Sequence, residues 1–97
     1  LRTVAGNLDM DEVNRLHHAS PMPQSLNAKD VAPTLAGLPQ IHFSGSEDRV
    51  VPNSVARGYA DASDSSCVQI VEVPGLTHGG HWEAHWSRLL AQQPACK

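Results

Sequence analysis

Two short apolar segments, each followed by a glycine-containing turn and then by a helical pattern, constrain the fold of this chain more than any other feature. They are Gln40–Ser44 and the β-branched run Cys67–Val73. Strand and helix patterns that alternate in this way predict an α/β domain with a parallel sheet and right-handed crossovers. In such a sheet the functional residues follow the carboxyl ends of the strands, which selects the loops 45–51 and 75–80.

The other elements follow from periodicity and from proline and glycine positions. We expect a strand over 1–6 and helices over about 10–18, from 27 or 30 to 36, 52–61 and 81–92, with a proline-rich loop over 20–25. Pro33 should shorten or break the second helix. In the last helix one apolar stripe is predicted to lie in the core: Trp82, Trp86, Leu89 and Leu90. Residues 1–97 are therefore expected to be one domain, a small three-layer α/β fragment with about three parallel strands and flanking helices.

Charge and hydropathy exclude two classes of partner. The net charge is −3, and the seven Lys and Arg residues are scattered from Arg2 to Lys97 rather than gathered in a patch. Nucleic-acid binding needs a concentrated basic surface, so we expect no nucleic-acid partner. The apolar runs are too short for a membrane span. The chain does not begin with Met, and Leu1–Ala5 reads as a strand entered partway, so we expect a fragment or a processed product.

The chain has two cysteines, Cys67 and Cys96. The first lies at the start of a predicted strand and the second follows the last predicted helix. A disulfide between them would fasten the C-terminal tail to the sheet and restrict the unfolded chain. Two free, buried thiols are the alternative, and the sequence leaves both open. A disulfide would favour an extracytoplasmic setting; without one the compartment is undetermined.

The two selected loops carry motifs that resemble those of α/β-hydrolases. The first reads G-x-x-D-x-x-x-P and contains Asp48; the second reads G-x-x-H and contains His78. The resemblance implies that Asp48 is the acid and His78 the base of a Ser-His-Asp triad, and that the chain is the C-terminal subdomain with the last three strands of that fold. Segments 4–9 and 25–27 also resemble the cap-side region of a bacterial subgroup.

One part of the family pattern is missing. The chain contains no G-x-S-x-G, and neither Ser44 nor Ser46 occupies such an elbow. In the family the nucleophilic serine and the oxyanion-hole segment come earlier in the chain, so they would lie upstream of Leu1. The resemblance thus implies a portion of a serine hydrolase for esters or related acyl bonds that is inactive alone and needs no cofactor. The alternative is a non-catalytic association module, which binds a second copy or the missing part through the exposed edge of 1–5 or an apolar face.

The candidate residues also have simpler interpretations. Asp48 can be a turn residue, with Glu47 as a competing acid, and His78 can be a polar loop residue. His81 and His85 are four residues apart on the predicted helix and, with His78, suggest a zinc or nickel site. Their order matches no metalloprotease motif, and no further ligand is evident, so we expect no metal. Three further histidines belong to no motif and are expected on the surface or in a strand: His17, His18 and His42.

Overall fold

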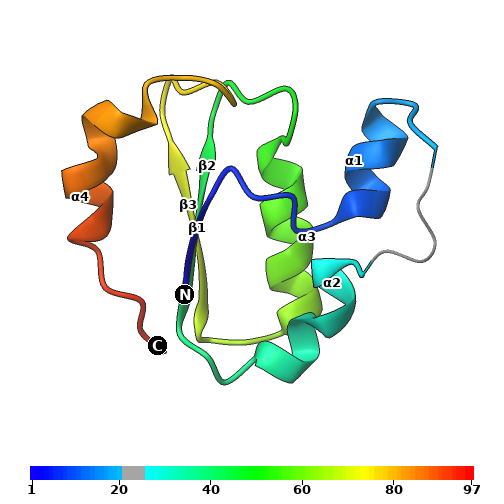
Figure 1. The fold of residues 1–97 in the computed structure, drawn as a ribbon. Coiled ribbons are helices and arrows are strands. Elements are labelled where there is room, and N and C mark those ends of the chain that lie inside the picture. The colour runs from blue at the N-terminus through cyan, green and yellow to red at the C-terminus, as the bar shows by residue number, and fades with distance from the viewer. Residues whose placement is uncertain (21–25) are drawn as a thin grey trace.

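The computed structural model describes residues 1–20 and 26–97 and has an α/β arrangement (Figure 1). Its sheet has three parallel strands in the order β1-β2-β3: β1 Arg2–Val4, β2 Gln40–Gly45 and β3 Val68–Val73. β2 lies in the middle, with Ile41 paired to Arg2 on one side and to Gln69 on the other. The predicted parallel sheet is confirmed, whereas most of the loop expected over 20–25 lies outside the described residues.

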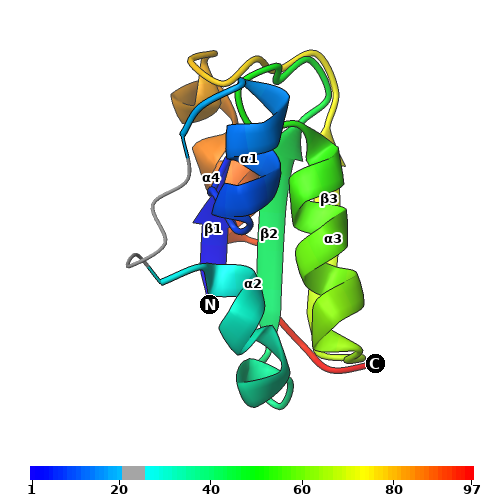
Figure 2. The same ribbon diagram turned by 90° about the vertical axis from the view of Figure 1, so that its right-hand side faces the viewer.

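Helices flank both faces of this sheet, as predicted. One face carries α1 Met10–Leu16, α2 Ala28–Val31, the 3₁₀ turn η1 Ala32–Leu35 and α3 Asn53–Ser63. The other face carries the 3₁₀ turn η2 Trp82–His85 and α4 Trp86–Leu90 (Figures 1 and 2). Across the described ranges the longest helix, α3, has 11 residues, and no helix combines the length and apolar character needed to cross a membrane.

Local sequence explains where the first helices begin and end. The Asp9 carboxylate accepts from the Glu12 N–H at the start of α1, and the Asn27 side chain accepts from the Lys29 N–H at the start of α2. Pro33 lies two residues beyond the end of α2, where the α-helix gives way to the 3₁₀ turn η1, and the predicted break is confirmed. At the end of α3, Asp64 adopts the left-handed conformation with φ 46°.

Several element boundaries differ from the prediction. The first strand ends at Val4 rather than at residue 6, because Ala5 turns out of the strand with φ 52°. α1 ends at Leu16 rather than at residue 18, because His18 has φ 54°. α3 continues two residues beyond the expected end at 61. Each of these differences is two residues at the end of an element and leaves the order of elements unchanged.

The last helix is the larger correction. Where one helix was predicted over 81–92, a 3₁₀ turn precedes a five-residue α-helix. A 3₁₀ turn has three residues per turn instead of 3.6, so the predicted stripe does not stay on one face. Leu89 is fully buried and Trp82 is half-buried, but Trp86 and Leu90 are 43% and 41% exposed and are not core residues.

The core consists of two apolar clusters. One packs around α3 and has as its buried members Leu8, Ala32, Val51, Val55, Ala56 and Tyr59. The other packs around α4 and has as its buried members Ile41, Phe43, Val73, Leu76 and Leu89. Ile41 and Phe43 of β2 belong to the second cluster, whereas His42 between them points to the other face and contacts Tyr59 of the first. The carboxyl end of the sheet is thus held in place from both sides.

A buried polar network joins β1, β2 and α3 within this core. His42 is 1% exposed; its Nδ1 lies 2.7 Å from Thr3 Oγ1 and its Nε2 lies 2.8 Å from Gln40 Oε1. Because an amide oxygen only accepts, Nε2 carries the proton and Nδ1 accepts from the threonine hydroxyl. The Tyr59 hydroxyl donates to the same Gln40 oxygen at 2.9 Å. His42 lies in a strand, as expected, but no motif in the sequence predicted this network.

This histidine makes the stability of the fold depend on pH. Burial, and to a smaller extent the positive amino terminus, lowers the pKa of His42 from 6.5 to about 4. Between these two values the unfolded chain binds a proton that the folded chain does not, so stability is lost as the pH falls. We expect the contribution of His42 to the unfolding free energy to fall by about 2 kcal/mol between pH 7 and pH 5.

Urea denaturation at both pH values measures this effect. His42→Gln, which stays neutral, is the matched control and should lose that part of the pH dependence. An equal pH dependence in the two proteins would contradict the prediction.

The C-terminal tail is fastened to the sheet at two places. The Arg2 guanidinium donates to the Gln92 carbonyl at 3.2 Å, just beyond the end of α4. Cys67 and Cys96 form a disulfide, so of the two possibilities that the sequence left open, the bonded one is observed. Beside it the Lys97 N–H donates to the Ser66 carbonyl at 3.0 Å. These contacts hold α4 and the tail against the sheet.

Candidate functional site

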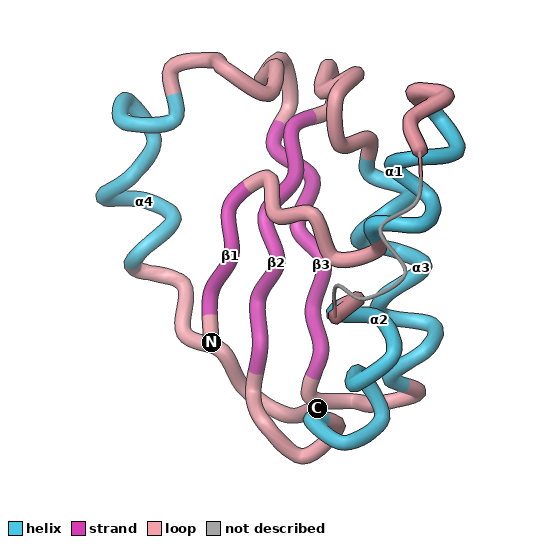
Figure 3. Tube along the Cα trace, turned by 45° about the vertical axis from the view of Figure 1, so that its right-hand side comes forward, coloured by secondary structure: helices cyan, strands magenta, loops and turns pink. Residues whose placement is uncertain are grey.

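The loops that follow β2 and β3 lie side by side at the carboxyl end of the sheet (Figure 3). They meet because the two strands are adjacent and parallel, so that their ends lie at the same edge. Backbone N–H groups donate from one to the other: Ser46 N–H to the Val73 carbonyl at 3.0 Å, Glu47 N–H to the Leu76 carbonyl at 3.0 Å, and Gly75 N–H to Ser46 Oγ at 2.7 Å. The two predicted loops therefore form one structural unit.

Gly45 permits this close approach. A Cβ atom at this position would lie 2.8 Å from the Leu76 carbonyl carbon and nearer still to its oxygen. Real Cβ atoms essentially never come so close to backbone, so only glycine fits unless one loop moves. The first glycine of the G-x-x-D turn is thus required by the packing of one loop against the other.

The Asp48 side chain is fully buried between the loops. Its Oδ1 accepts from the backbone N–H groups of Val50 at 2.9 Å and Val51 at 2.8 Å, and its own N–H donates to the Gly45 carbonyl at 3.1 Å. A side chain that accepts from the backbone two and three residues ahead is a local turn device typical of aspartate. These bonds fix the carboxylate and leave Oδ2 directed toward the other loop.

That second oxygen accepts a hydrogen bond from His78. Its Nδ1 lies 3.0 Å from Asp48 Oδ2, and its side chain is 40% exposed. An ionised carboxylate only accepts, so Nδ1 carries the proton and, in the neutral ring, Nε2 is left as the acceptor. Within 1–20 and 26–97 no hydrogen bond to Nε2 is recorded. The two predicted site residues are thus brought together, and it is Asp48, not the exposed Glu47, that contacts the histidine.

The histidine borders an open pocket of about 380 Å³. The lining residues come from both loops: Glu47, Arg49, Val50, Thr77, His78 and Gly79. An imidazole oriented by a buried carboxylate can accept a proton from a hydroxyl and is stabilised as the imidazolium that results. The arrangement can therefore act as an acid-base pair for a nucleophile placed next to Nε2.

The serines near this end of the sheet are engaged elsewhere. The Ser44 hydroxyl is buried and donates to the Asn53 side-chain oxygen at the start of α3. Ser46 Oγ accepts from the Gly75 N–H. Both contacts support the absence of a nucleophile elbow that the sequence indicates. They assign these two residues to the scaffold that positions the pair.

Sequence reasoning missed one histidine at the rim of the site. His17, assigned to the surface, is exposed, but its Nε2 lies 2.6 Å from the Val50 carbonyl oxygen in the acid loop. Val50 also donates its N–H to Asp48, so His17 links the end of α1 to the turn that holds the acid. The two residues are 33 positions apart, and no motif connects them, which is why the sequence carried no signal.

The structure does not assemble the histidines into a metal centre. His81 precedes the 3₁₀ turn and its Nδ1 lies 3.4 Å from Glu83, whereas His85 Nδ1 lies 2.9 Å from an Arg88 nitrogen. Throughout the described ranges no group of three or more His, Cys, Asp or Glu side chains is placed to hold a metal ion. His78 is instead paired with Asp48.

Comparison of the chain with models of protein families, with curated proteins and with solved structures finds no match. Any functional assignment therefore depends on the chemistry of the two loops. The feature that carries most weight is the bond between Asp48 and His78, because it joins a buried carboxylate to a histidine thirty positions away at the border of an open pocket.

The orientation of His78 gives a direct prediction. In neutral His78 we expect the proton on Nδ1, because Asp48 accepts it. In the Asp48→Asn variant the amide can keep accepting from Val50 and Val51 through its oxygen, so its NH₂ faces the ring and the proton moves to Nε2. Long-range ¹H–¹⁵N correlation spectra of the neutral ring distinguish the two forms. Glu47→Gln is the matched control and should leave the wild-type form; the same tautomer in wild type and Asp48→Asn would contradict the prediction.

Proposed function

We propose that this chain is the C-terminal portion of an α/β-hydrolase and supplies the acid, Asp48, and the base, His78, of a serine triad. The observation that supports this most is the 3.0 Å contact between Asp48 Oδ2 and His78 Nδ1 at the carboxyl ends of adjacent parallel strands. The order of elements, the glycine at the start of each loop and the open pocket beside the ring agree with it. The substrate class is an ester or a related acyl bond.

In this proposal the pair acts on a serine hydroxyl supplied by an upstream segment. His78 Nε2 takes the hydroxyl proton as the oxygen attacks the acyl carbon, and it then returns that proton to the leaving alcohol. Asp48 keeps the ring in the required tautomer and stabilises the imidazolium. Oxyanion donors, worth roughly 10²–10³ in rate, would also come from upstream. The described loops contribute base and acid only.

The coding DNA upstream of Leu1, read in frame, tests this proposal first. A G-x-S-x-G that follows a predicted strand and precedes a helix would support it. A start codon immediately before Leu1, with no such motif, would contradict it. A parallel test uses the chain itself with p-nitrophenyl acetate. Because the chain lacks the serine and the oxyanion donors, it should hydrolyse this ester no faster than an exposed imidazole does. A much higher rate that His78→Ala abolishes would show that this chain carries a serine-type nucleophile of its own.

A second candidate function is association without catalysis, and the open side of β1 favours it. β1 pairs only with β2 among the described strands. The Leu1 carbonyl and the Ala5 N–H bond to β2, so by alternation the backbone groups of Arg2 and Val4 point outward. An edge of this kind accepts an extended strand from a second copy or from the missing part of the sheet. A monomeric mass by light scattering at high concentration would count against self-association.

We further propose that the protein matures in an oxidising compartment. The disulfide between Cys67 and Cys96 supports this, because such bonds persist outside the reducing cytosol. Alkylation of the protein as isolated from its natural source, without reductant, tests it. An unmodified pair is expected, and quantitative labelling of both thiols would contradict the proposal.

A further inference from the structure

The outer edge of β3 is open along its length. The Cys67 carbonyl accepts from the Gln40 N–H of β2, and the Val73 carbonyl accepts from the Ser46 N–H just after β2. Backbone groups in a parallel ladder alternate in direction, so the N–H and C=O groups of Val68, Ile70 and Glu72 point away from the sheet. Among the described residues, no backbone hydrogen bond outside the ladder is recorded for these groups. The free edge is bounded at one end by the contact of Lys97 with Ser66 and at the other by Pro74, which lacks an N–H.

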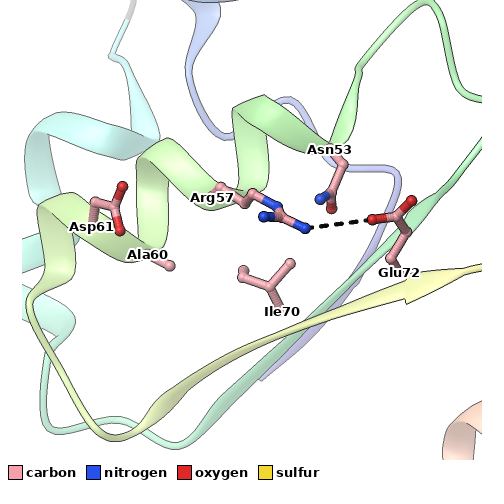
Figure 4. Close-up of a pocket in the computed structure, with 6 residues that line it drawn as sticks. All are labelled: Asn53, Arg57, Ala60, Asp61, Ile70 and Glu72. Atoms are coloured by element: carbon pink, nitrogen blue, oxygen red, sulfur yellow. Dashed lines mark ion pairs between the residues drawn. The ribbon is translucent and has the colours of Figure 1, made fainter.

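A groove of about 420 Å³ lies beside this edge, between β3 and α3 (Figure 4). Its lining is Asn53, Arg57, Ala60, Asp61, Ile70 and Glu72. Ile70 lies in the middle. Arg57 and Glu72 lie toward one end, where they form an exposed 3.6 Å ion pair, and Asp61 lies toward the other end (Figure 4). The positive and the negative charge on α3 are thus one helical turn apart, on either side of an apolar centre.

We propose that this edge is a homodimer interface, in which β3 pairs antiparallel with β3 of a second copy about a two-fold axis near Ile70. Such an axis reverses the strand, so Val68 of each copy lies opposite Glu72 of the other. It also reverses α3 and brings Arg57 of one copy to the side of Asp61 of the other, twice in each dimer. The surface is therefore complementary in charge to itself, which is what a two-fold interface requires.

The alternative pairings fit the surface less well. Joining β3 of one copy to β1 of the next would be head-to-tail and would produce an open-ended filament. Pairing β1 with β1 offers outward backbone groups from only two residues, Arg2 and Val4, and the Arg2 side chain beside them is bonded to the tail. The β3 edge has three outward residues and the matching charges. This inference does not depend on the hydrolase proposal. A missing part of the sheet would pair with β1, and β3 forms the opposite edge.

Two charge reversals and their mixture test the interface. Arg57→Glu makes both contacts acidic, and Asp61→Arg makes both basic, so each variant alone should raise the dimer dissociation constant about tenfold. In an equimolar mixture, the glutamate introduced at position 57 of one variant faces the arginine introduced at position 61 of the other. The native Asp61 of the first variant then faces the native Arg57 of the second, so both contacts join opposite charges. The mixture should therefore dimerise again, as measured by sedimentation velocity or light scattering.

These measurements distinguish a lost interface from a disturbed fold and from association through another surface. Both positions are exposed, so the melting temperatures of the variants should match that of wild type, and a disturbed fold would be seen there. A wild type that is monomeric at millimolar concentration would overturn the proposal. So would variants that dimerise as strongly as wild type, since association would then use another surface such as β1. Single variants that are monomeric and remain so in the mixture would also overturn it, because the charges would then not face each other.

Discussion

Removal of the disulfide is expected to lower the unfolding free energy by about 3–4 kcal/mol, a large part of the total stability of a domain this small. The bond joins Cys67 and Cys96, which are 29 residues apart and enclose β3 and α4. Closing a loop of that length reduces the conformational entropy of the unfolded chain, and this is the source of the stabilisation in the chain-entropy model. A small core needs such support, because a short chain buries a modest fraction of its surface.

Urea denaturation of the oxidised and the reduced protein measures this contribution. The Cys67→Ala/Cys96→Ala double variant should resemble the reduced protein and should not respond to reductant, which separates the effect of the bond from any effect of the reagent. Hydrogen exchange adds a local measurement. The Lys97 amide should lose protection on reduction, whereas α4 should keep most of its own because Arg2 still holds the carbonyls at its end. Equal stability of oxidised and reduced protein would contradict the prediction.

The arrangement of the site was predictable because it follows from local signals. Gln40–Gly45 and Val68–Val73 are short segments with apolar residues typical of strands, and each is ended by a turn. Their alternation with helices implies a parallel sheet with both loops at one edge. Asp48 and His78 each follow one of these strands, so their proximity was implied by topology alone. The predicted glycine of the first loop proved necessary for packing as well.

What the sequence did not reveal depends on contacts between distant segments. His17 reaches the Val50 carbonyl, and His42 meets Thr3, only because the fold brings separate elements together. The last helix was misjudged for a different reason. Periodicity assumes 3.6 residues per turn, and a 3₁₀ turn before Trp86 alters the face that this residue presents. Irregular backbone of this kind has no clear signature in the side-chain pattern.

Gly45→Ala is expected to be the most damaging small substitution at the site, with a loss of about 3 kcal/mol in unfolding free energy. The added Cβ meets backbone of the other loop at Leu76, not the flexible end of a side chain, so relief requires that the two loops separate. Separation breaks the bond from Glu47 N–H to the Leu76 carbonyl and draws the histidine loop away from Asp48. His78 should then lose its preference for the Nδ1-protonated form, in the same spectra that report on Asp48→Asn.

Gly58→Ala is the matched control, because it adds the same methyl group at a position with no atom within 4 Å. Gly58 lies inside α3, where alanine is favoured over glycine by roughly 0.5–1 kcal/mol, so this variant should gain stability and leave His78 unchanged. The two variants therefore move stability in opposite directions. If Gly45→Ala kept both its stability and the His78 tautomer, the loops would have to tolerate displacement at their closest contact, and Gly45 could not be what fixes the distance between Asp48 and His78.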